Sequence, residues 1–253
     1  MSDIENAKDK VMMGVERKSL ILTPKEKEVT AYHEAGHALV AYYTEGADPV
    51  HKISIIPRGM ALGITAQIPE EEKHNYQKKY LLGRLDILMG GRCAEKIIFN
   101  DTSTGAGNDI ATATDISRKM VCEWGMSDRI GPLTFGKKSE EVFLGREISH
   151  SRDYSDEISQ IIDDEISLFV KKAEDNAENI IKTNLDDLKS IANALLEYES
   201  ISGDEMKQVI NGEPIVRIEP KKQKKRVRRR KKTTENVTEN SDSSQPIITK
   251  PAT

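Results

Sequence analysis

Two histidines four residues apart, His33 and His37, have the types and spacing that most clearly indicate chemistry in this sequence. On a helix, side chains at positions i and i+4 lie above one another on one face, so both ring nitrogens can bind one metal ion. Glu34 completes an H-E-x-x-H pattern, in which the glutamate is the general base of metal-assisted hydrolysis. The alternative is a pair of hydrogen-bonded core histidines, which is disfavoured because burying three polar side chains without a metal or partners is costly.

A hydrolytic zinc site commonly has three protein ligands and an open fourth position, so a third ligand must come from another element. The third histidine of the longer H-E-x-x-H-x-x-G-x-x-H pattern is missing, because Val40 and Tyr43 occupy its glycine and final positions. Two carboxylates are candidates: Asp109 at the head of a predicted helix, and Glu95 after a double glycine. The alternative role of Asp109 is a carboxylate that stabilises the start of its helix. The alternative roles of Glu95 are a surface charge or a group that holds a histidine ring by a hydrogen bond. Spacing alone leaves both open.

The element that carries the motif has clear helix signals. Thr23 as N-cap, Pro24 at the first helical position and Glu26 form a capping box, which predicts a helix from Pro24 to about Thr44. Gly46 is a natural stop. The interior is apolar on most faces, so this helix should be buried on most sides.

From Val50 the apolar period changes from helical to alternating, which predicts two short strands joined through residues 57–59. The apolar positions of the pair are Ile53, Ile55, Ile64, Ala66 and Ile68. Plain structural packing is the commoner role of such a pair, and the alternative is an edge to which an extended peptide adds as another strand.

Most of the remaining sequence has helical periodicity. A helix is expected over residues 73–99, where Gly90 and Gly91 cost about 1 kcal/mol each and therefore indicate the close approach of another backbone. A turn-rich link at 103–109 should open a helix over 110–124, and 131–135 reads as a weak strand. Two further amphipathic helices separated near residue 183, and a short one after a capping box at 202–205, predict a C-terminal helical bundle. The predicted fold class is mainly α, with the H-E-x-x-H helix, a small β-sheet and this bundle.

Charge is unevenly distributed along the 253 residues. The run 221–232 holds ten Lys or Arg, and residues 1–220 keep 27 basic against 39 acidic residues, a net charge of −12. The tail after residue 212 has no core-forming pattern and should be disordered. A basic run can bind nucleic acid or anionic lipid, but no aromatic residues interleave it, so no specific nucleic-acid binding is expected.

The cysteine content and hydropathy set further limits. Cys93 and Cys122 are far apart in the sequence and form no C-x-x-C motif, so they indicate neither a disulfide framework nor a thiolate zinc site. No apolar run approaches the roughly 20 residues that span a bilayer, so this chain by itself is expected to be soluble.

Several motifs together resemble the peptidase domain of the FtsH family of AAA-type, ATP-dependent zinc metalloproteases. They are AYHEAGHA at 31–38, DPVHK at 48–52, IIPRG at 55–59, GGR at 90–92, STGAGND at 103–109 and VFLG at 142–145. The opening AKDKVMMGVERK at 7–18 resembles the joint between the family's ATPase module and its peptidase. We expect the chain to consist of a lead-in (1–22), a zinc peptidase domain (23–212) and a disordered basic and polar tail (213–253). The resemblance runs from about residue 4 to residue 212 and does not cover the tail.

The resemblance implies Zn²⁺ held by His33, His37 and Asp109, with Glu34 as catalytic base and Glu95 as the alternative ligand or a group that orients a histidine. It also implies an endopeptidase for unfolded or damaged proteins, including membrane proteins, that forms a homo-hexamer on the cytoplasmic face of the bacterial inner membrane. ATP and the membrane would act only through segments that this sequence lacks, since it has no G-x-x-x-x-G-K-[ST] loop. The alternative is a non-catalytic assembly platform with a structural metal. The intact Glu34 disfavours it, because a structural zinc site needs no general base.

Overall fold

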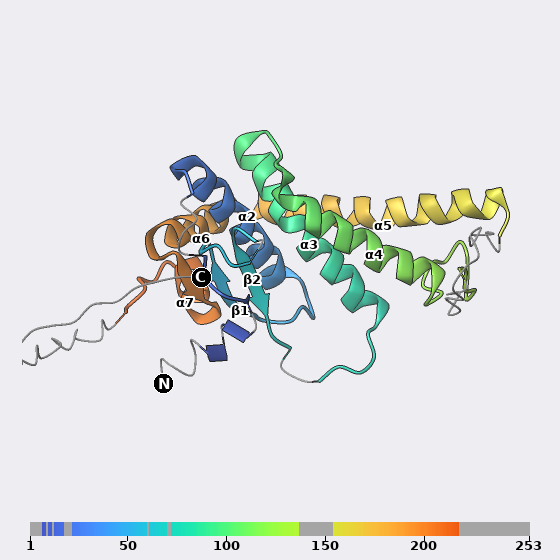
Figure 1. Ribbon diagram of the computed structural model, residues 1–253, viewed down its shortest axis with the longest axis horizontal. Helices are drawn as coiled ribbons and strands as arrows, with labels where there is room; N and C mark the ends of the chain where they lie inside the picture. The colour runs from blue at the N-terminus through green and yellow to red at the C-terminus, as the bar shows by residue number, and fades with distance from the viewer. Residues whose placement is uncertain are drawn as a thin grey trace, which may run out of the picture. The chain divides into compact units, whose positions relative to one another are not determined.

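Helix α2, Pro24–Tyr43, forms in the computed structural model where the capping signals predict it (Figure 1). The Thr23 hydroxyl accepts a hydrogen bond from the Glu26 amide at 3.2 Å, and the Thr23 amide donates to the Glu26 carboxylate at 2.8 Å. Nearly every residue from Thr30 to Ala41 is buried. The expectation that this helix is buried on most sides is therefore confirmed.

The structure describes residues 7–8, 10–11, 13–17, 22–59, 61–69, 72–136 and 154–217. The VFLG motif at 142–145 and the basic run at 221–232 lie outside the described residues. The lead-in is described only in part: residues 7, 8, 10, 11 and 13 are helical, and residues 14–17 are not. Within the described ranges, no helix is both long and apolar enough to cross a membrane.

The predicted strand pair is present as β1, Val50–Ser54, and β2, Ile64–Gln67, which pair antiparallel. A third strand that the sequence did not reveal, β3 at Ser200–Ser202, pairs antiparallel with the other side of β1. Three residues are too few to show an alternating pattern, so β3 had no sequence signal. The strand order β2-β1-β3 leaves β2 at one edge of the sheet.

Helix α3, Lys78–Phe99, packs against α2, α4 and α5 and begins later than the residue 73 that its apolar pattern indicated. The first of its two central glycines, Gly90, has the role expected of it. A Cβ atom added at Gly90 would lie 2.7 Å from the carbonyl oxygen of Gly36 on α2, closer than real Cβ contacts occur. The two helix backbones therefore approach each other at Gly36 and Gly90, which fixes α3 against the helix that carries the motif.

The link after α3 forms a 3-10 turn, η1 at Thr104–Ala106, and leads directly into α4, Gly107–Cys122. The weak strand expected at 131–135 is wrong. The Phe135 amide donates to the carbonyl of Cys122 at the end of α4, and the Leu133 amide donates to Gly131, so this segment closes a helix end and a turn.

The C-terminal helices are α5, Asp156–Thr183, α6, Leu185–Tyr198, and α7, Gly203–Ile210. Helix α5 packs mainly on α3, and α6 packs mainly on α2, as Figure 1 also shows for the long α5 beside α3. The bundle and the motif helix thus share one hydrophobic core. Its fully enclosed members include Leu39, Ile53, Leu85, Met120, Ile181, Leu188, Ile191 and Leu195.

Candidate metal centre

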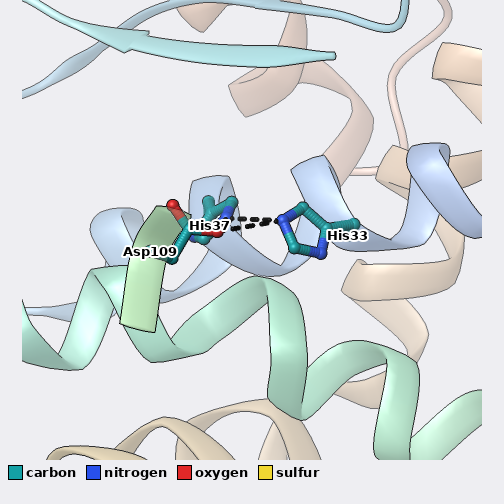
Figure 2. A group of neighbouring side chains, drawn as sticks. All are labelled: His33, His37 and Asp109. Carbon is teal, nitrogen blue, oxygen red and sulfur yellow. Dashed lines mark hydrogen bonds and ion pairs between the residues drawn. The ribbon is translucent and has the colours of Figure 1, made fainter. Parts of the chain in front are cut away.

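Three potential metal ligands meet between two helices. His33 and His37 lie one turn apart on α2, and Asp109 lies in the first turn of α4 (Figure 2). The two Nε2 atoms are 3.0 Å apart, and Asp109 Oδ2 lies 3.3 Å from Nε2 of His33 and 3.4 Å from Nε2 of His37. In the part of the chain that the structure describes, this is the one cluster of imidazole, thiol and carboxylate groups arranged to hold a metal ion.

The hydrogen bonds of the two rings fix which nitrogen faces the centre. Nδ1 of His37 lies 2.7 Å from the carbonyl oxygen of Ile87, which can only accept, so Nδ1 carries the proton. Nδ1 of His33 lies 2.7 Å from Oε1 of Glu95 and donates to that carboxylate. In the neutral rings both Nε2 lone pairs then point toward Asp109, and three electron-pair donors converge with no proton between them. Such a group can hold a cation.

The spacing of these atoms fits zinc. Zn²⁺ binds nitrogen and oxygen at about 2.0–2.2 Å in a tetrahedron, whose corners are then about 3.3–3.6 Å apart. The observed separations of 3.0, 3.3 and 3.4 Å form one face of such a tetrahedron after shifts of a few tenths of an ångström. The imidazoles are 10% exposed and the Asp109 side chain is 20% exposed, so the group is largely buried but remains open to the surface on one side.

The charges around the centre favour a cation there. Burial lowers the pKa of His33, but the Asp109 and Glu95 carboxylates outweigh burial and raise that pKa to about 10. Burial raises the pKa of Asp109, and hydrogen bonds from His33 and His37 reverse this and hold it well below its ordinary value. The surroundings therefore stabilise one positive charge. Either a proton on His33 or a bound metal ion can supply that charge, and the two compete for the site.

Glu95 connects the two elements that carry the ligands. Its Oε1 accepts from His33, and its Oε2 accepts from the Ser103 amide at 2.7 Å. The Ser103 hydroxyl in turn accepts from the Gly105 amide at 3.1 Å, within the turn that leads to Asp109. Glu95 therefore lies on the Nδ1 side of His33, outside the group of three, and links the histidine to the start of α4.

Gly91 makes room for the imidazole rings. A Cβ atom added at this position of α3 would lie 2.6 Å from Nε2 of both His33 and His37. The sequence indicated a close backbone contact for both glycines of the pair, and this is true of Gly90, whereas Gly91 faces the rings. Any side chain there would fill the space in which the ligand atoms lie.

Glu34 is buried beside the centre, with 6% of its surface exposed. Its Oε2 accepts a hydrogen bond from the Thr65 hydroxyl at 2.7 Å. Burial raises the pKa of Glu34, while the neighbouring histidines and the Thr65 hydrogen bond oppose that rise. A carboxyl group with these opposing influences suits both uptake and release of a proton.

The structure thus brings together four of the five residues that sequence reasoning selected, and places Glu95 one hydrogen bond behind His33. Sequence reasoning missed two contacts, from the Ile87 carbonyl and the Thr65 hydroxyl. The first has no sequence signal, because every residue has a carbonyl. The second has only a weak sequence signal, a hydroxyl residue in the second strand after the motif helix.

Comparison with known proteins gives an independent result. The model of the family described as peptidase family M41 matches residues 20–209. The chain is 53% identical over 220 residues to the ATP-dependent zinc metalloprotease FtsH of Acidobacterium capsulatum, covering 87% of this chain and 34% of that protein. It is 50% identical over 225 residues to the protein of the same name from Magnetococcus marinus, covering 88% of this chain and 33% of that protein. The chain therefore spans about a third of the length of these relatives.

Proposed function

Because this chain belongs to peptidase family M41 and is a zinc metalloprotease, we propose that it is the peptidase part of a longer ATP-dependent enzyme that cleaves unfolded proteins. One observation carries the chemistry of this proposal. Two imidazole nitrogens and the Asp109 carboxylate converge with a spacing that fits zinc, and the carboxylate of Glu34 lies beside them.

In this proposal His33, His37 and Asp109 are the protein ligands of zinc, and the fourth position is left for the reaction. Zinc held by these three residues would act as a Lewis acid toward the scissile carbonyl and would make water a stronger nucleophile. Glu95 and the Ile87 carbonyl hold the two imidazoles by their Nδ1 protons, which keeps each Nε2 lone pair on the metal side.

Glu34 transfers the proton in this mechanism. Its carboxylate takes a proton from the attacking water while the oxygen forms a bond to the scissile carbon. The same carboxyl group then donates that proton to the leaving nitrogen as the C–N bond breaks, so Glu34 ends each cycle unprotonated. The elevated pKa that burial gives this carboxyl group makes its carboxylate a stronger base and so favours the first transfer, from water.

The properties of the longer protein also belong to the proposal. The names of the relatives include ATP dependence, and the lead-in of this chain resembles the segment that follows the family's ATPase module. We expect a hexameric assembly at a membrane, with substrates such as damaged membrane proteins threaded to the site, and we expect the ATPase module and anchor to come from outside these residues.

The test combines metal content with hydrolysis. The purified chain should contain one equivalent of zinc by elemental analysis and should cleave casein, and removal of zinc by a chelator should abolish cleavage reversibly. Glu34→Gln keeps the size of the side chain but removes the base, so zinc should remain while hydrolysis falls by several orders of magnitude. Zinc binding without hydrolysis by the unaltered chain would instead support a structural metal in an assembly platform.

A further inference from the structure

The two oxygens of the Glu34 carboxylate have different surroundings. Oε2 accepts the hydrogen bond from Thr65 at 2.7 Å. Oε1 lies where a side chain at position 63 would begin, since a Cβ atom added to Gly63 would be 2.6 Å from it. One oxygen is therefore held by a donor, and the other occupies a space kept free by a glycine.

Both contacts come from β2 and the residue before it, and the position of this strand is well fixed. Thr65 pairs with Ile53, a fully buried residue of β1, which pairs on its other side with Ile201 of β3. Because successive side chains of a strand point to opposite faces, a slip of one residue would turn Thr65 away from α2. The sheet therefore fixes the Thr65 hydroxyl relative to Glu34.

The Thr65 hydroxyl has a second acceptor nearby. Its Oγ1 lies 3.1 Å from the backbone oxygen of Glu34, against 2.7 Å from Oε2. The hydroxyl has a single proton, and a bond to an ionised carboxylate is shorter and stronger than one to a neutral carbonyl. Thr65 accordingly donates to Oε2, the nearer of the two acceptors.

We propose that Thr65 is the positioning residue of the general base: its hydroxyl holds Oε2 of Glu34, so that Oε1 exchanges the proton with water and with the leaving amine. This inference rests on the proposed function, and it adds a role for the edge strand. Thr65 touches neither the reacting atoms nor the proposed ligands and acts through Glu34. The space at Gly63 is the second part of the arrangement, because it accommodates Oε1.

The decisive variant is Thr65→Val, which removes the hydroxyl, keeps the branched shape and remains favourable in a strand. We expect one equivalent of zinc, an unchanged KM within about twofold, and a kcat lowered by about 10- to 100-fold, as misplacement of a catalytic group by about 1 Å does. Thr65→Ser restores the donor and should recover kcat to within about threefold of the unaltered protein.

Thr30→Val is the matched control. Thr30 is buried near the same site, and its methyl group would lie 2.9 Å from a Cβ at Gly63, but its hydroxyl donates to the carbonyl of Glu26 at 2.8 Å. Removing this hydroxyl should leave kcat unchanged. A crystal structure of the Thr65→Val protein supplies a readout that is independent of activity, and we expect the Glu34 carboxylate to leave the position it holds here.

The outcomes separate the inference from the proposed function. If the unaltered chain lacks zinc-dependent hydrolysis, or if Glu34→Gln retains it, the proposed function fails and the inference fails with it. If the unaltered chain is active and Glu34→Gln is not, the role of Thr65 is overturned by a normal kcat in Thr65→Val, by loss of zinc, by failure of serine to rescue, or by an unmoved Glu34 in the crystal.

Discussion

Replacing Gly91 with alanine should weaken zinc binding without unfolding the protein. The added Cβ would lie 2.6 Å from Nε2 of His33 and from Nε2 of His37, whereas ordinary contacts begin at 3.4 Å. Both ring nitrogens must therefore move by about 0.8 Å or the helices must separate by that amount. Zinc–ligand distances in a real site lie within about 0.2 Å of their usual values, and a displacement of about 0.8 Å exceeds this, so the zinc affinity should fall by more than about 100-fold.

The effect on the metal-free protein should be small, because two contributions oppose each other. Alanine inside a helix is favoured over glycine by about 1 kcal/mol. Against this, turning the rings strains their Nδ1 bonds to Glu95 and to the Ile87 carbonyl, and a buried polar group that loses its partner costs about 1–3 kcal/mol. The unfolding free energy without metal should thus change by no more than about 2 kcal/mol, while saturating zinc should stabilise the variant by about 2.7 kcal/mol less than the unaltered protein.

The assay is a zinc titration against a chromophoric chelator, with thermal unfolding recorded by circular dichroism with and without zinc. Gly107→Ala is the control, since Gly107 has helical backbone angles and no atom within 4 Å of an added Cβ, and this variant should bind zinc normally. If Gly91→Ala bound zinc as tightly as the unaltered protein, the close packing of α3 on the two histidines would not be what shapes the centre.

Three further results are expected. Asp109→Ala should lose zinc and activity together after dialysis, whereas Glu95→Gln should weaken zinc binding by about 10- to 100-fold at most; the opposite pattern in elemental analysis would make Glu95 the third ligand. Burial raises the pKa of Asp86 from 3.8 to about 6, and a weaker hydrogen bond from Asn176 opposes this rise. Because the folded protein then holds this proton more tightly than the unfolded chain, the resulting stability is fully present below pH 3.8 and is lost as the pH rises through about 6. Asp86→Asn should therefore be more stable than the unaltered protein at pH 7 and show no such gain at pH 3.5 in denaturant titrations. A chain that ends at Gly212 loses Ile215, which is partly buried against the core, so its melting temperature should fall by no more than a few degrees while its rate on a short peptide is kept. A drop of many degrees would show that later residues are a larger part of the folded domain.

The sequence by itself determined the motif helix and the placement of its two histidines on one face. Both depend on local rules: the capping box sets the start of α2, and a spacing of four places His33 and His37 on one face whatever surrounds them. The long helices α5 and α6 were predictable for the same reason, because their apolar stripes persist over many turns. The close contact at Gly90 was also indicated locally, by the cost of glycine inside a helix.

Only the tertiary structure decided which groups meet at the centre. Asp109 is 72 residues from His37 in the sequence, and its approach depends on how α4 packs against α3 and on the link through Ser103 and Glu95. The Ile87 carbonyl, the space at Gly91 and the Thr65 hydroxyl likewise act across elements that are distant in the chain. Spacing along a sequence specifies neighbours within one helix or strand, whereas the distance between atoms on different elements is set by the packing of the whole core.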